Sequence, residues 1–141
     1  MLTIHPYLNF LGKTEEAFIF YKSVFGGEFS MLSRFSDTPF SDQVPEADRN
    51  KIMHIALPIG NGIHLMGTDI VESMGQTMTV GSNVHLTIMT HSEDEAKRIF
   101  AAFAEEGKVT MPLEKTYWAE AFGMVIDKFG TSWMVNYDVA K

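Results

Sequence analysis

The sequence contains no cysteine, which excludes disulfide bonds and any chemistry that needs a thiol. It is also poor in basic residues, because 11 lysines and arginines against 18 aspartates and glutamates give a net charge of −7. Nucleic-acid phosphates are bound by clustered lysine and arginine, so a nucleic-acid partner is not expected. No apolar run approaches the roughly 20 residues that cross a bilayer, and the N-terminus does not resemble a signal peptide. These absences predict a cytoplasmic protein without a membrane partner.

What the sequence does contain is an internal repeat. Residues 4–10 (IHPYLNF) and 84–90 (VHLTIMT) carry His5 and His85 at matching points, 80 residues apart. A stretch with helical spacing of apolar residues follows each run and ends at a glycine before a new strand. A repeat of this length indicates two copies of one module rather than a short solenoid unit. We expect matching residues to face one shared cleft.

Alternating apolar and polar residues predict half-buried strands, and a spacing of three to four predicts helices. The first module, residues 1–68, is expected to hold a helix with Thr14 as its N-cap, and the second, residues 83–141, a helix capped by Ser92 and Glu95. Residues 69–82 read as the linker. The expected strands are 3–10, 28–35, 51–59, 62–68, 83–90, 108–113, 121–128 and 132–139. The prediction is an α+β fold of two paired βαβββ modules that form a U-shaped, eight-stranded mixed sheet around a cleft.

The alternation also places several polar side chains on the strand faces turned away from the helices. His5, His64 and His85 are expected there, and three imidazoles with an open position suit a divalent metal that acts as a Lewis acid. Asn136 would join them, but its amide oxygen is a poor ligand for such a metal. The alternative is that the histidines line a metal-free pocket. The cofactor is therefore a divalent metal (Zn, Fe, Ni or Mn) or none.

Other residues are candidates for binding or proton transfer. Tyr7 or Glu120 would act as acid or base. His54 is expected to be a hydrogen-bonded core or pocket histidine rather than a ligand, and His91 a surface residue. Trp118 and Phe122 form either an aromatic wall for a planar ligand or part of the core. The predicted ligand-binding residues are Tyr7, Asn9, Met66, Thr87, Trp118, Phe122 and Asn136.

Four segments carry a resemblance to a known family. Residues 6–10 (PYLNF), 24–27 (VFGG), 107–113 (GKVTMPL) and 122–130 (FGMVIDKFG) resemble the vicinal oxygen chelate superfamily, which includes glyoxalase I, and more closely its PhnB-like branch. The resemblance implies paired βαβββ modules, usually in a homodimer. It implies metal ligands on the first and fourth strands of each module, which are His5, His64, His85 and Asn136 here. Glyoxalase-like enzymes have glutamate at the last position. Some relatives carry a ubiquinone-methyltransferase label, although this sequence has no methyl-donor motif.

Three functions follow as hypotheses. The first is a divalent-metal lyase, isomerase or dioxygenase that acts on a small oxygenated molecule, with the metal held by the three histidines. The second is a metal-free protein that binds or sequesters a planar or hydrophobic small molecule, as resistance-type relatives do. The third is a structural or regulatory dimer without a ligand. In each case the expected assembly is a homodimer.

Overall fold

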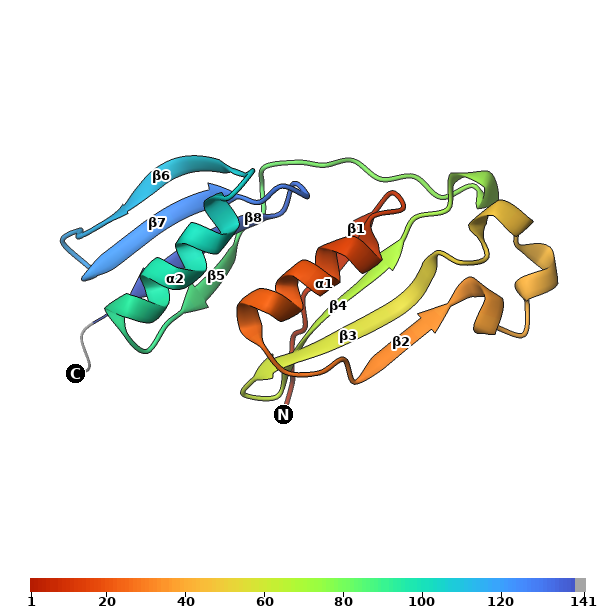
Figure 1. The fold of residues 1–141 in the computed structure, drawn as a ribbon, viewed down its shortest axis with the longest axis horizontal. Coiled ribbons are helices and arrows are strands. Elements are labelled where there is room, and N and C mark those ends of the chain that lie inside the picture. Colours follow the sequence, from red (N-terminus) through yellow and green to blue (C-terminus); the bar gives the residue numbers. More distant parts are fainter. Residues whose placement is uncertain (139–141) are drawn as a thin grey trace. The chain divides into compact units, whose positions relative to one another are not determined.

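The computed structural model describes residues 1–138 and divides into two compact units, Met1–Thr79 and Val80–Lys141. Each unit has the element order βαβββ (Figure 1). In the first unit these elements are β1 (Tyr7–Phe10), α1 (Thr14–Phe25), β2 (Met31–Arg34), β3 (Ile52–Gly60) and β4 (Ile63–Asp69). In the second they are β5 (Leu86–Met89), α2 (Glu93–Ala104), β6 (Lys108–Glu114), β7 (Ala121–Ile126) and β8 (Ser132–Tyr137). No helix within residues 1–138 has the length and apolar character needed to cross a membrane.

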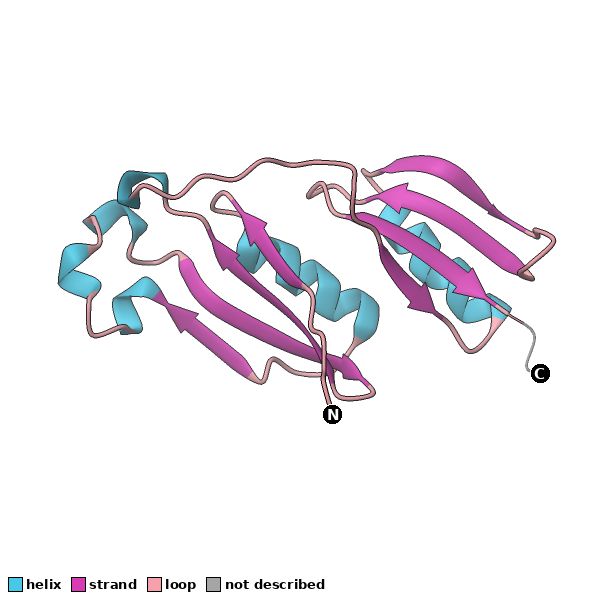
Figure 2. Cartoon of the chain, turned by 180° about the vertical axis from the view of Figure 1, so that it is seen from behind, coloured by secondary structure: helices cyan, strands magenta, loops and turns pink. Residues whose placement is uncertain are grey.

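Both units build the same four-stranded mixed sheet. The strand order is β1-β4-β3-β2 in the first and β5-β8-β7-β6 in the second, with the first pair parallel and the others antiparallel. The helix of each unit covers one face of its sheet, and the other face is called the helix-distal face below (Figure 2). This arrangement confirms the α+β prediction of two βαβββ modules.

The apolar stripe of each helix supplies the core of its unit. Ala17 and Tyr21 of α1 are fully buried, as is Ala96 of α2, while Phe103 of α2 stacks on Trp133 of β8 with ring centroids 4.6 Å apart. Corresponding residues of the two apolar stripes, such as Ala17 and Ala96, are 79 residues apart in the sequence, whereas His5 and His85 are 80 apart. Apolar burial of this kind is the main source of stability in such units.

Some strands, β1 above all, are shorter than predicted. β1 begins at Tyr7 rather than at residue 3, and Pro6 only accepts, from the N–H of Met66, because proline has no N–H to donate. The long segment between β2 and β3 contains three 3-10 turns, Phe35–Asp37, Ser41–Gln43 and Glu46–Asp48. Val44 in this segment packs with Phe35 and Val71 in a small core of its own, which anchors the segment to the unit.

The predicted N-cap at Thr14 is wrong. Lys13 occupies the cap position without a side-chain hydrogen bond, and Thr14 is the first helical residue. Its hydroxyl donates to Oδ1 of the buried Asp69 at 2.7 Å, and its N–H donates to the same oxygen at 3.1 Å. The N–H of Ile52 donates to Oδ2 at 2.8 Å. Asp69, at the end of β4, therefore caps α1 and ties it to β3. The Ser92 cap is confirmed, since Ser92 Oγ accepts from the N–H of Glu95 at 3.0 Å.

We expect Thr14→Val to destabilise the protein by about 1–2 kcal/mol, because the buried Asp69 carboxylate loses one donor and gains no replacement. Urea unfolding followed by circular dichroism measures the change. Thr79→Val is the matched control, since Thr79 is exposed. Equal stability of the two variants would show that the Thr14 hydroxyl contributes nothing.

Candidate functional site

The helix-distal face of the first sheet gathers three of the predicted ligand-binding residues. Tyr7 lies opposite Met66, and Asn9 lies opposite Thr68, in the parallel pair of β1 and β4. Tyr7 and Asn9 are exposed, whereas Phe10 at the end of β1 is buried. The alternation predicted from the sequence therefore places Tyr7, Asn9 and Met66 on one face, as expected. Ligand binding by these residues stays a prediction.

His5 and His64 lie side by side on this face. Their ring centroids are 5.3 Å apart with planes at 72°, and the backbone N–H of His64 donates to Nδ1 of His5 at 2.9 Å. The parallel pairing of β1 and β4 positions His64 beside the chain that leads into β1. Two of the three predicted metal ligands are thus neighbours within one unit.

The imidazole pair does not fit a divalent metal as the unit is arranged. A neutral imidazole that accepts a hydrogen bond at Nδ1 carries its proton on Nε2, so His5 has no lone pair left for a metal. Metal-bound histidines do the reverse, and donate from the second nitrogen to an acceptor. Among the described residues, neither unit contains a group of three His, Cys, Asp or Glu side chains that could hold a metal ion. The three-histidine site, which draws on both units, stays a prediction.

Asn136 is not the counterpart of His64. In the second unit Leu86 pairs with Trp133 and Met89 pairs with Asn136. His85, one residue before Leu86, therefore corresponds in register to Ser132, which takes the place that His64 has in the first unit. The expected equivalence of Asn136 and His64 is wrong, because Asn136 lies four residues after Ser132 in β8. Asn136 is also 95% buried.

His54 of β3 contacts Tyr7, a neighbour that sequence reasoning did not predict. Its Nδ1 lies 3.2 Å from the hydroxyl of Tyr7, and the ring centroids are 5.6 Å apart. The prediction of a hydrogen-bonded histidine is confirmed. Tyr7, the predicted acid or base, thus has an imidazole as its hydrogen-bond partner. The two side chains meet because the strand order is β1-β4-β3. This order was not predicted from the sequence, so the contact could not be predicted either.

The helix-distal face of the second sheet is apolar. Across its middle Thr87 pairs with Met134, which pairs with Met124, while Phe122 pairs with Asn136. Trp118 packs edge to face on Phe122, with centroids 5.3 Å apart, and Tyr117 packs in the same manner on Trp118 at 4.8 Å. The predicted residues Thr87, Phe122 and Asn136 therefore share one face, and Trp118 extends it. Trp118 is 49% exposed.

Glu120, the other predicted acid or base, lies in the second unit immediately before β7. Its Oε2 is 3.6 Å from Nζ of Lys115, and both side chains are partly exposed. A surface ion pair of this kind contributes little to stability. The backbone N–H of Glu120 donates to the carbonyl oxygen of Tyr137, and this hydrogen bond holds the start of β7 beside β8. Catalysis by Glu120 stays a prediction.

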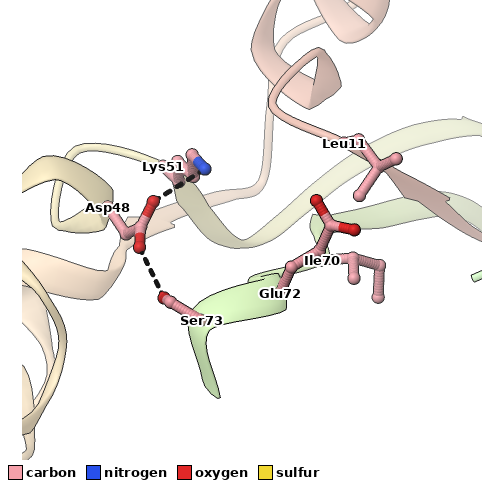
Figure 3. Close-up of a pocket in the computed structure, with 6 residues that line it drawn as sticks. All are labelled: Leu11, Asp48, Lys51, Ile70, Glu72 and Ser73. Atoms are coloured by element: carbon pink, nitrogen blue, oxygen red, sulfur yellow. Dashed lines mark hydrogen bonds and ion pairs between the residues drawn. The ribbon is translucent and has the colours of Figure 1, made fainter. Parts of the chain in front are cut away.

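A pocket of about 290 Å³ lies in the first unit, away from the predicted site residues (Figure 3). Oδ1 of Asp48 lies 2.7 Å from Nζ of Lys51, and Oδ2 of Asp48 accepts a hydrogen bond from Oγ of Ser73 at 2.7 Å. The hydrogen bonds from Lys51 and then Ser73 lower the pKa of Asp48 below its ordinary value. Asp48, Lys51 and Ser73 therefore form an ion pair and a hydrogen bond with one another in this pocket. The lining residues are Leu11, Asp48, Lys51, Ile70, Glu72 and Ser73.

Comparison with known proteins gives one consistent result. A family model described as 3-demethylubiquinone-9 3-methyltransferase matches residues 2–136. Protein YjdN of Escherichia coli is 31% identical over 140 residues, which is 96% of this chain and 95% of that protein. The crystal structure of PA1353 from Pseudomonas aeruginosa is 37% identical, with a TM-score of 0.86 over 98% of each chain. A Bacillus cereus PhnB protein, titled a putative 3-demethylubiquinone-9 3-methyltransferase, is 28% identical, with a TM-score of 0.78 over 96% of this chain and 99% of that one.

Proposed function

We propose that this chain, which belongs to the 3-demethylubiquinone-9 3-methyltransferase family, in the PhnB-like branch of the vicinal oxygen chelate superfamily, binds a small planar, apolar molecule without a divalent metal. The binding surface in this proposal is the helix-distal face of the second sheet. Methyl transfer has no part in it, since the sequence has no methyl-donor motif.

One observation carries the proposal, namely the gathering of exposed aromatic and thioether groups on that face. Trp118 is 49% exposed, Met89 59% and Met111 40%, and Trp118 packs on Phe122. A contiguous exposed apolar patch on a protein indicates a binding surface. Rigid aromatic rings offer flat area to a planar ligand, and flexible thioethers adapt to its outline.

The metal-enzyme hypothesis is the weaker one on the same chain. It gains from the adjacency of His5 and His64, but the Nδ1 atom of His5 already accepts from the N–H of His64. Releasing that nitrogen would require a new tautomer or a new ring orientation. The proposal therefore assigns the first unit's face a hydrogen-bonding role, with Tyr7 and His54 as its polar pair.

The neutral planar fluorophore N-phenyl-1-naphthylamine tests the proposal. We expect saturable binding that is unchanged by EDTA and weakened about tenfold in Trp118→Ala, because losing one aromatic contact costs about 1.4 kcal/mol. Phe40→Ala is the matched control, since Phe40 is 38% exposed and lies in the first unit. Binding that is abolished by EDTA, or equal loss in both variants, would refute the proposal.

A further inference from the structure

Three methionines of the second sheet are paired with one another across neighbouring strands. Met111 of β6 pairs with Met124 of β7, and Met124 pairs with Met134 of β8. We call these three residues the methionine row. Side chains directly opposite in antiparallel strands have Cβ atoms about 4.5–5.5 Å apart, which applies to the regular pair Met124 and Met134. Met111 is paired with Met124 between two irregularities in the register of β6 with β7. Three thioethers therefore rise from neighbouring points of one surface.

Strand pairing places the three methionines on the helix-distal face. The alternate residues Val125 and Val135 are buried on the other side of the sheet, where Gly123, the partner of Val135, faces Phe100 of α2. Sδ of Met134 is 3.5 Å from Oγ1 of Thr87, which fixes it on the distal side of β8. Met111, at the other end of the row, is 40% exposed. The row is thus accessible from solvent at its β6 end.

Thioether sulfur is a soft, neutral ligand that selects Cu(I) over divalent hard or borderline cations. Methionine has three rotatable bonds in its side chain, so three sulfurs on adjacent strands can converge on one ion. The net charge of −7 favours the approach of a cation. The geometry points to a Cu(I) site formed by Met111, Met124 and Met134. This site uses no histidine and does not depend on the proposed binding of a planar molecule.

Anaerobic titration of the full-length protein with Cu(I), in competition with bicinchoninate, tests the site. We expect one tightly held Cu(I) per chain, and at least about tenfold weaker binding in Met124→Leu, which removes the central ligand. Leucine has a similar volume, so the sheet keeps its packing. Met74→Leu is the matched control, because Met74 is 41% exposed and lies in the first unit.

The pH dependence separates this site from a histidine site. Thioethers carry no proton to displace, so the Cu(I) affinity should be the same at about pH 5.5 and about pH 7.5, whereas an imidazole site weakens as its ligands protonate. Loss of affinity on acidification overturns the inference. Equal binding by the wild type and the triple variant M111L/M124L/M134L, or no Cu(I) retained against bicinchoninate, does so as well. Trp118→Ala, which weakens the binding of N-phenyl-1-naphthylamine, should hold Cu(I) as tightly as the wild type does, which distinguishes the two proposals.

Discussion

Gly107→Ala should be the most destabilising single substitution proposed for this chain, at about 3 kcal/mol or more. A Cβ at this position would overlap the carbonyl oxygen of Phe103 and would lie 2.6 Å from the carbonyl oxygen of Ile126. Both oxygens belong to the backbone, one in α2 and one at the end of β7, so neither can move without disturbing its element. The helix and the sheet of the second unit would have to separate.

Urea unfolding followed by tryptophan fluorescence measures this effect, because both tryptophans, Trp118 and Trp133, lie in the second unit. Gly81→Ala is the control. A Cβ there would meet nothing nearer than Oδ1 of Asn83 at 3.4 Å, so a change within about 0.5 kcal/mol is expected. If Gly107→Ala were as stable as Gly81→Ala, the close approach of α2 to β7 would be refuted.

Asp127→Ala should destabilise the second unit by about 3 kcal/mol, because its buried carboxylate satisfies three donors at once. Oδ1 accepts from the N–H groups of Phe129 and Thr131, at 2.8 and 3.1 Å, and Oδ2 accepts from Nε1 of Trp133 at 2.9 Å. Trp133 is 98% buried, so its indole N–H would have no water in place of the lost partner.

A double-mutant cycle with Trp133→Phe measures the indole hydrogen bond separately. Phenylalanine lacks the N–H, so Asp127→Ala should cost about 1–2 kcal/mol less in the Trp133→Phe background than in the wild type. These variants are followed by circular dichroism, since Trp133 is itself changed. Asp42→Ala, at an exposed position, is the control. An equal cost in both backgrounds would mean that the Asp127–Trp133 bond contributes no stability.

The sequence was sufficient for the fold because the informative patterns are local. Alternation in residues 4–10 and 84–90, the helical spacing of apolar residues after each run, and the glycines after each helical stretch are patterns among residues close together in the chain. The predicted βαβββ order and the Ser92 cap follow from such short-range signals, and both are confirmed.

The failures all concern contacts between distant segments. Thr14 looks like a cap until Asp69, 55 residues later, is seen to take that role. Alternation within each strand puts both Asn136 and His64 on the face turned away from the helix, but only the pairing of β5 with β8 shows that Ser132 takes the place of His64. Likewise, the Tyr7–His54 contact spans three strands. Register and strand order are long-range properties that local alternation does not specify.

The parallel pairing of β1 with β4 has a consequence for biosynthesis. Within its unit β1 leaves the ribosome first, yet its sheet partner β4 extends to Asp69, which is also the residue that caps α1. The nascent first unit therefore cannot close while its last strand is untranslated. At about 5–20 residues per second, several seconds pass during which the apolar side of α1 has no finished sheet beneath it.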